Sequence, residues 1–204
     1  MKTELSKNGF IHLTNQSQEQ LQSVINSLGD VIMTTDVVVK TESKGMVTTA
    51  LGLDYHTDHH KAKYILWYCY KQTDKGGESI IIDAEKVYSK LSLEFQEELK
   101  KINLFEHKVF PDDQEYYPLV ALDEKGKKKF YYSFWLVKDE DRSNVALREF
   151  QKIIKETDAT EIKLQEGDIL IVDNHRVFHG RKAIEGSKNR FLKRYWIVES
   201  NKNL

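Results

Sequence analysis

The sequence lacks several features that mark particular classes of protein. Its only cysteine is Cys69, so it forms neither an intrachain disulfide nor a CxxC zinc site. No apolar run approaches the ~20 residues that cross a bilayer. The first residues also lack the continuous apolar core of a secretory signal. These absences predict a cytoplasmic protein with no membrane partner.

The chain also has no excess of charge of either sign. Lysine and arginine total 31 against 32 acidic residues, which gives a formal net charge of -1. Because a general nucleic-acid binder normally carries a basic excess, we expect no nucleic-acid partner. The 204 residues are 40% hydrophobic, enough for one sizeable core. We therefore predict a single domain over residues 1–204, whose oligomeric state the sequence does not indicate.

Hydrophobic spacing predicts many short strands and few helices. Ser17 and Gln20 have capping-box spacing, which predicts a helix from Ser17 that stops at Gly29. Further helices are expected at 84–102, broken near Ser92, and at 144–157. Strand-like runs lie at 9–13, 37–40, 64–70, 79–83, 105–110, 117–122, 129–137, 168–173 and 191–198. Because no regular crossover helices separate these runs, they favour an antiparallel β-sandwich or barrel over a doubly wound parallel sheet.

Three residues have the chemistry of a metal centre. In an extended segment His56 and Asp58 face the same side, and a third candidate, His179, lies far downstream in DNHRVFHGR. Two histidines and one carboxylate on one face of a metal leave three adjacent positions open, as non-haem Fe(II) oxygenases require. The HxD spacing alone is weak evidence, since a chain with seven histidines also produces it by chance.

The surrounding motifs strengthen this interpretation. The sequence resembles the taurine dioxygenase-like (TauD/TfdA) family of Fe(II)/2-oxoglutarate enzymes. The resemblance runs in order through HTD at 56–58, GGES at 76–79, YPLV at 117–120, GDILIVDNHRVFHGR at 167–181 and NRFLKRYW at 189–196. It implies a mainly β fold with flanking helices, the double-stranded β-helix or jelly roll.

The resemblance also implies roles for individual residues. His56, Asp58 and His179 match the iron ligands, and Arg190 matches the arginine that pairs with the distal carboxylate of 2-oxoglutarate. Ser79 stands where the family usually has a threonine that supports the same carboxylate. Arg194 matches a position that binds an anionic group of the substrate in some members.

The residues support these arginine roles independently. The planar guanidinium fork binds a carboxylate with two charge-assisted hydrogen bonds. Arg190, Leu192, Arg194 and Trp196 alternate, so both arginines would face one side of the last strand. Two arginines directed into a sandwich are costly without anions to pair with. For Arg194 the alternative is an ion pair with a nearby aspartate or glutamate.

Other polar residues are interpreted as structural. His59 and His60 flank the motif, because a fourth protein ligand would occupy a position that 2-oxoglutarate or O₂ needs. His175 lies four residues before His179, but a strand running into a loop is not the geometry of a helical zinc pair. The remaining residues with an expected structural role are His12, His107, Cys69, Asn174, Arg176 and Arg181.

The sequence thus predicts a dioxygenase that uses Fe(II), 2-oxoglutarate and O₂ to hydroxylate a small-molecule substrate. Asp58 favours oxygenation over halogenation, because related halogenases replace this carboxylate with a small residue. Desaturation or cleavage and a non-catalytic metal or 2-oxoglutarate sensor stay open as alternatives. Loops at 40–53 and 111–129 are the expected pocket rims, and Arg194 opposite their acids would suit a small zwitterion such as a free amino acid.

Overall fold

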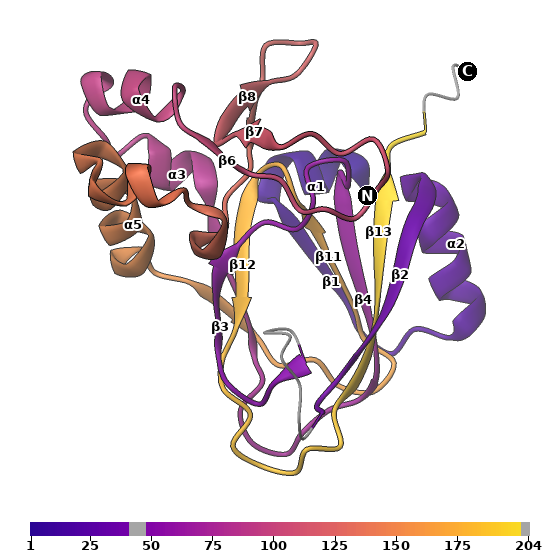
Figure 1. Ribbon diagram of the computed structural model, residues 1–204. Helices are drawn as coiled ribbons and strands as arrows, with labels where there is room; N and C mark the ends of the chain where they lie inside the picture. Colours follow the sequence, from indigo (N-terminus) through magenta and orange to yellow (C-terminus); the bar gives the residue numbers. More distant parts are fainter. Residues whose placement is uncertain (41–47, 201–204) are drawn as a thin grey trace.

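Two antiparallel β-sheets face each other and enclose the middle of the molecule (Figure 1). The computed structural model describes residues 1–40 and 48–200. The larger sheet has the order β1 (Phe10–Leu13), β11 (Ile169–Asp173), β4 (Tyr64–Lys71), β13 (Phe191–Val198), β2 (Asp30–Val38). The smaller sheet has the order β10 (Thr160–Ile162), β5 (Ser79–Asp83), β12 (Val177–Arg181), β3 (Leu53–His56). The expected mainly β fold with antiparallel sheets is confirmed.

The larger sheet is covered on both faces, which explains its long apolar runs. In β11, Ile169 and Ile171 belong to the cluster under the N-terminal helices, whereas Leu170 and Val172 belong to the cluster between the sheets. Since successive side chains of a strand point to opposite faces, a strand that is buried on both sides is apolar at every position. Leu170 also lines the pocket described below.

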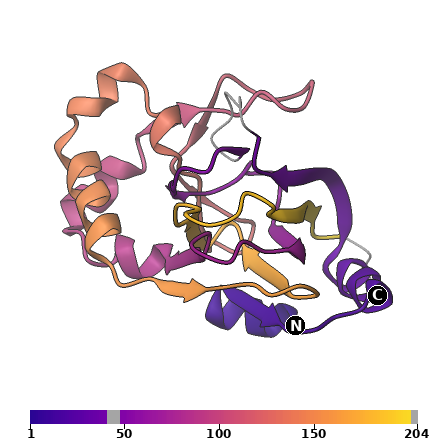
Figure 2. The ribbon, with the colours of Figure 1, turned by 90° about the horizontal axis from the view of Figure 1, so that it is seen from below.

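Helices cover the outer faces of both sheets (Figures 1 and 2). α1 (Lys2–Asn8) and α2 (Gln18–Leu28) pack outside the larger sheet, and the predicted capping box of Ser17 and Gln20 is present. The helix expected at 84–102 is broken as predicted, because the Ser92 hydroxyl accepts a hydrogen bond from Phe95 N and begins a second helix. The three helices behind the smaller sheet are α3 (Ala84–Tyr88), α4 (Leu93–Leu99) and α5 (Val145–Glu156).

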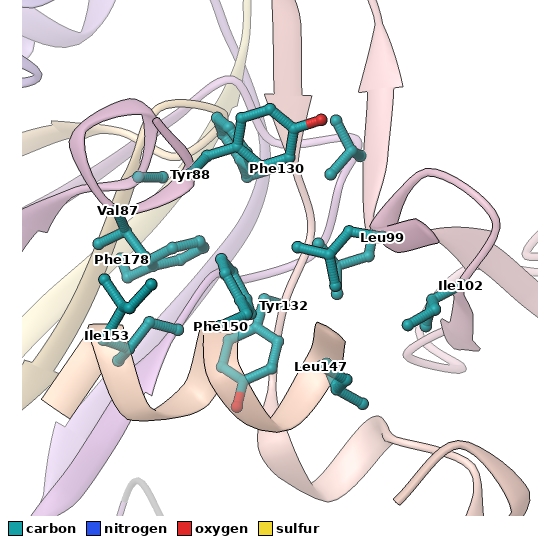
Figure 3. Close-up of a cluster of buried hydrophobic side chains, with 14 of the residues drawn as sticks. Val87, Tyr88, Leu99, Ile102, Phe130, Tyr132, Leu147, Phe150, Ile153 and Phe178 are labelled. Carbon is teal, nitrogen blue, oxygen red and sulfur yellow. The ribbon is translucent and has the colours of Figure 1, made fainter. Parts of the chain in front are cut away.

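The core behind the smaller sheet determines how β12 is oriented. Phe178 is fully buried, and its ring packs edge-on against Phe150, with ring centroids 5.7 Å apart (Figure 3). Because side chains alternate along a strand, the next residue, His179, points to the opposite face, between the two sheets. Gly180 follows, and a Cβ there would lie 2.5 Å from the Leu53 carbonyl oxygen, so only glycine lets β3 approach this closely.

Some strand predictions were wrong. In the run at 37–40 only Val37 and Val38 are in a strand, at the end of the longer β2. In the run at 105–110 only Phe105 is in a strand, β6 (Asn103–Phe105). The run at 117–122 divides at Leu119 into β7 (Tyr116–Pro118) and β8 (Val120–Leu122). The run at 129–137 contains the end of β9 (Lys128–Phe130) and the 3-10 helix η2 (Phe134–Leu136), and η3 (Asp139–Ser143) follows.

A long-range contact explains the last of these differences. Tyr132 exchanges hydrogen bonds with Thr57 through Thr57 N–H (2.7 Å) and the Thr57 hydroxyl (2.9 Å), so its backbone pairs with the loop that follows β3 instead of a β ladder. An apolar run predicts that its residues are buried, but it does not predict which segment they pair with.

Within residues 1–40 and 48–200, none of the helices has the length and apolar character needed to cross a membrane.

Candidate metal centre

Three side chains meet between the sheets: His56, Asp58 and His179. His56 is the last residue of β3 and lies directly opposite His179 of β12 in the antiparallel register. Their ring centroids are 4.4 Å apart, and His179 Nε2 lies 3.8 Å from Asp58 Oδ2. One donor atom from each residue lies within 4.8 Å of the others. The structure therefore brings together the three residues that the sequence singled out.

Asp58 does not reach this position by strand alternation. β3 ends at His56, so Asp58 lies in the loop 57–62, which we call the metal loop. The buried Asn174 holds this loop: its Oδ1 accepts Asp58 N–H (2.8 Å), and its Nδ2 donates to the carbonyls of His59 (3.1 Å) and Ala62 (3.0 Å). The expected scaffold role of Asn174 is confirmed, and the extended segment ends two residues earlier than expected.

Both imidazoles have the form that a metal requires. His56 Nδ1 donates to the carbonyl oxygen of Asp54 (2.9 Å), which leaves the Nε2 lone pair free. Neither ring nitrogen of the buried His179 has a hydrogen-bond partner among the described residues. Burial lowers the pKa of His56 and, reinforced by the nearby His56, lowers the pKa of His179 to about 3. Both rings are therefore neutral at pH 7.

The carboxylate of Asp58 is the charged member of the set. Burial on its own raises the pKa of Asp58, but Arg194 and the two histidines outweigh it, so the pKa lies below its usual value. Two neutral imidazoles and one carboxylate fit Fe(II), and they leave room for further ligands. Such an ion would bind one of the two unpartnered ring nitrogens of His179.

Two residues of β13 hold the Asp58 carboxylate. Arg194 Nη1 donates to Oδ1 (2.9 Å) and Oδ2 (3.2 Å), and Trp196 Nε1 donates to Oδ2 (3.1 Å). The sequence left two alternatives for Arg194, and its ion pair with an aspartate is the one that the structure contains. Trp196 was not predicted to contact the site, although its place in the alternation after Arg194 puts it on the same face.

A pocket with a buried cation adjoins the three residues. Arg190 is 4% exposed, and its Nε donates to Gln72 Oε1 (3.1 Å). No carboxylate in residues 1–40 and 48–200 forms an ion pair with Arg190. Burial, reinforced by Arg181, lowers the pKa of Arg190 to about 10. We call this space the Arg190 pocket; it is lined by Val37, Leu53, His56, Trp67, Ser79, Ile81, Leu170, His179, Gly180, Arg181, Arg190, Leu192 and Arg194.

A buried guanidinium that lacks an anion is costly, so the Arg190 pocket is suited to a carboxylate. Ser79, at the start of β5, lines the same pocket and adds a hydroxyl. Sequence reasoning missed Gln72, whose Nε2 is buried without a partner in the described part of the chain and is a further donor beside Arg190. Its position after an apolar strand gave no signal of this role.

The other polar residues mostly occupy the structural positions expected of them. His12 Nε2 contacts Asp168 Oδ2 (2.9 Å), and His175 Nε2 donates to the His60 carbonyl (2.7 Å), so His175 and His179 form no zinc pair. Cys69 is fully buried. The remaining three residues all form hydrogen bonds: His107 with Tyr131, Arg176 with Asp83, and Arg181 with the carbonyls of Thr49 and Leu51.

The expectations for the loops are only partly met. Residues 41–47 of the first loop lie outside the described residues, while Leu53 at its end does line the Arg190 pocket. No residue of 111–129 lines that pocket. Asp113 is one of the acids of this expected rim, but its side chain is fully buried against Lys61. The acids of this loop therefore do not face Arg194 across the pocket.

The comparisons with known proteins agree with this geometry. Residues 1–196 match the family model "Taurine catabolism dioxygenase TauD, TfdA family". The chain is 26% identical to gamma-butyrobetaine dioxygenase of Homo sapiens over 215 residues, which cover 89% of this chain and 54% of that protein. It spans about half the length of the curated relatives it matches.

Solved structures show the same fold. An asparagine oxygenase in complex with Fe(II), 2S,3S-3-hydroxyasparagine and succinate superposes with a TM-score of 0.74 and 17% identity, covering 96% of this chain and 77% of the other. The non-heme iron oxygenase OrfP with Fe, succinate and (3S)-hydroxy-L-Arg gives a TM-score of 0.72 and 17% identity, with 98% and 78% covered. Because the family model matches nearly the whole chain, this protein belongs to the TauD/TfdA family of dioxygenases.

Proposed function

We propose that this protein is an Fe(II)/2-oxoglutarate-dependent dioxygenase. The observation that carries the proposal is the junction of two features: a triad of two neutral imidazoles and a carboxylate, and beside it the buried Arg190, which has no acidic partner among the described residues. A plain metal site would need no second anion pocket. His56, Asp58 and His179 would hold iron, and Arg190 with Ser79 would bind the distal carboxylate of 2-oxoglutarate.

Each residue has a distinct task in this mechanism. Iron, when bound, supplies the oxidation chemistry in which O₂ is consumed and 2-oxoglutarate is converted to succinate and CO₂. Arg190 fixes one end of the co-substrate, so that its other end faces the triad. The apolar walls formed by Trp67, Ile81 and Leu170 exclude water from this space. Trp196 and Arg194 hold Asp58 in one orientation.

The proposed substrate is a small polar or zwitterionic molecule such as a free amino acid. The solved relatives contain hydroxylated asparagine or arginine, and the human relative is named for gamma-butyrobetaine. Arg194 stays our candidate for an anionic group of the substrate. Asp58 occupies its Nη1, but its Nε is buried without a hydrogen-bond partner within the described residues, which leaves a donor for a second anion.

We propose hydroxylation as the outcome, because Asp58 is present and halogenation needs that coordination position. The alternatives are desaturation and a non-catalytic sensor. We also propose that the protein acts in the cytoplasm as a single domain, on a small molecule and without a nucleic-acid partner. The charge balance of the chain supports the last point.

A turnover assay tests the proposal. Purified protein is supplied with Fe(II), 2-oxoglutarate and O₂, and succinate is measured with a panel of amino acids and small carboxylates or sulfonates. We expect one class to stimulate succinate formation, and we expect Asp58→Ala to abolish it. Full activity of Asp58→Ala would refute the triad. Tight binding of metal and 2-oxoglutarate with no turnover on any compound would instead favour the sensor.

A further inference from the structure

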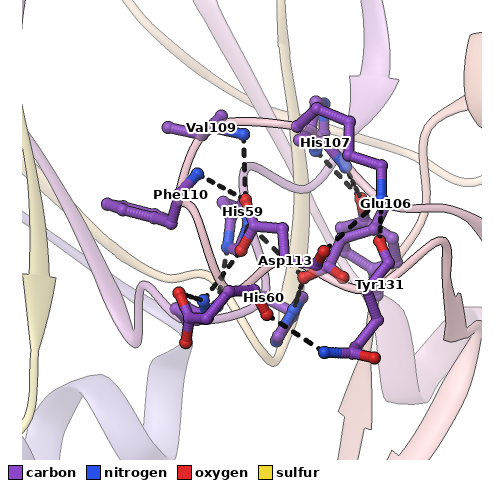
Figure 4. A network of polar contacts seen from close by, with 12 residues as sticks. His59, His60, Glu106, His107, Val109, Phe110, Asp113 and Tyr131 are labelled. Atoms are coloured by element: carbon purple, nitrogen blue, oxygen red, sulfur yellow. Dashed lines mark hydrogen bonds and ion pairs between the residues drawn. The ribbon is translucent and has the colours of Figure 1, made fainter.

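A second buried polar cluster lies beside the metal loop (Figure 4). Its members are His59 and His60 of the metal loop and Glu106 and Asp113 of the loop 106–113, which follows β6. The side chains of Glu106 and Asp113 are 1% and 0% exposed. Carboxylates are rarely buried this completely unless they are paired. The burial of these two carboxylates is not explained by the His56, Asp58 and His179 triad, to which neither belongs.

The cluster has the composition of a metal site, since donor atoms of His59, His60 and Glu106 lie within 4.8 Å of one another. However, His59 Nδ1 accepts the backbone N–H of Lys61 (3.1 Å). Because Nδ1 accepts this hydrogen bond, the ring hydrogen is on Nε2, which lies close to Asp113 Oδ1 (3.1 Å) and Glu106 Oε1 (3.5 Å) but forms no hydrogen bond with any described residue. A nitrogen that carries hydrogen cannot ligate a metal, so this geometry favours a network of paired side chains.

Asp113 joins the two loops in this network. Its Oδ2 accepts the backbone N–H groups of Val109 (2.9 Å) and Phe110 (2.6 Å) within its own loop. Its Oδ1 contacts Lys61 Nζ (2.8 Å) and faces His59 in the metal loop. One buried carboxylate thus fixes the shape of its own loop and attaches that loop to the residues that directly follow Asp58.

Glu106 makes the second attachment. Its Oε1 accepts a hydrogen bond from His60 Nε2 and faces His59 Nε2. The His60 ring also stacks on Tyr117, with centroids 3.6 Å apart and an interplanar angle of 10°. Asn174 holds the backbone of Asp58 and His59 in the same loop. The His59 ring lies 5.9 Å from the ring of Trp196, the tryptophan that donates to Asp58.

We propose that Asp113 and Glu106 are positioning residues for the iron centre: together with Asn174 they hold the metal loop, and so keep Asp58 in place. The inference rests on the proposed function, because it assumes that Asp58 ligates a metal. Residues that orient a metal ligand from outside the ligand shell typically change metal affinity by about 10–100-fold when they are replaced.

The chain offers a matched control next to Asp113. Asp112 contacts the same Lys61 Nζ at 2.7 Å, but its side chain is 80% exposed. Asp113→Asn and Asp112→Asn therefore make the same chemical change to two partners of one lysine, inside and outside the cluster. Glu106→Gln is the second test variant, because its amide keeps the size of the carboxylate and an acceptor for His60.

The experiment titrates metal-free proteins with Co(II), an oxygen-stable substitute for Fe(II), and records the dissociation constant, the metal bound per chain and the melting temperature. We expect Asp113→Asn and Glu106→Gln to weaken Co(II) binding about tenfold, and Asp112→Asn to leave it within about twofold. Should Asp113→Asn not fold, the comparison of Glu106→Gln with Asp112→Asn decides.

Two results would overturn the inference. The first is wild-type Co(II) affinity in the folded Glu106→Gln or Asp113→Asn protein, even with a lower melting temperature, because the cluster would then be only structural. The second is two Co(II) ions per wild-type chain and one in Glu106→Gln, because the cluster would then itself be a metal site. Asp58→Ala separates this inference from the proposed function: unchanged Co(II) binding in that variant would refute the triad, whatever the cluster does.

Discussion

Asn174 offers a sharp test of how the proposed iron centre is built, because one buried amide bonds to the backbone at several positions of the metal loop. We predict that Asn174→Ala leaves at least two buried groups without partners. These are Asp58 N–H, which donates to Oδ1 at 2.8 Å, and the Ala62 carbonyl, which accepts from Nδ2 at 3.0 Å. The His59 carbonyl keeps a partner, because it also accepts Ala62 N–H (3.0 Å).

The magnitude follows from these two groups. An unsatisfied buried donor or acceptor costs about 1–3 kcal/mol, so Asn174→Ala should lower the free energy of unfolding by about 2–6 kcal/mol. Asn174→Asp should cost more, although it has nearly the same shape. It places a carboxylate oxygen against the carbonyls of His59 and Ala62 in a fully buried position, where charge without compensation is costly.

Chemical denaturation of the metal-free proteins measures these costs, and Co(II) titration of the folded variants measures the effect on the metal site. We expect Co(II) affinity to fall about tenfold or more in Asn174→Ala. The reasoning would be wrong if Asn174→Asp were more stable than Asn174→Ala, or if Asn174→Ala unfolded within 1 kcal/mol of wild type, a threshold at the lower end of the cost of one lost partner.

Three further predictions concern Trp196, Arg190 and Asp168. Trp196→Phe removes one donor to the Asp58 carboxylate, worth about 1.5–3 kcal/mol, so we expect Co(II) affinity to fall about tenfold or more; an unchanged value would show that Arg194 alone orients Asp58. Arg190→Lys loses the planar fork, so the KM for 2-oxoglutarate should rise at least about tenfold with Co(II) affinity unchanged; a normal KM would exclude Arg190 from the pocket's function. Burial raises the pKa of Asp168, but hydrogen bonds from Gln165 N–H and His12 outweigh it, so the folded pKa lies below the unfolded value of about 3.9. This stability is present above that pH and is lost as the pH falls through the folded pKa. Denaturation curves should therefore show Asp168→Asn as less stable at pH 7 by about 1–3 kcal/mol, with the difference shrinking below about pH 4; a constant difference would contradict the linkage.

Much of the site could be predicted from the sequence, because its chemistry is carried by residue types at fixed spacings. His56, Asp58 and His179 were identified from an HxD motif and a distant histidine, and Arg190 from the resemblance to the TauD/TfdA family. The strand with alternating Arg190 and Arg194 was also recognised, since period-two alternation depends only on neighbours along the chain. The same holds for Ser17 and Ser92, whose side chains begin helices through bonds to residues three positions away.

Only the tertiary structure decided how distant segments meet. It placed Arg194 and Trp196 in contact with Asp58, left Arg190 without an acid among the described residues, and buried Asp113, an acid of the loop expected to form a pocket rim. The apolar run at 129–137 also does not form one continuous strand, because the Tyr132 backbone forms hydrogen bonds with Thr57. The contacts of Asp58, Asp113 and Tyr132 join residues 52 to 138 positions apart, and which distant partner a side chain meets is fixed by the packing of the whole chain. The sequence by itself determined which chemistry the protein can carry, and the fold decided which residues hold that chemistry in place.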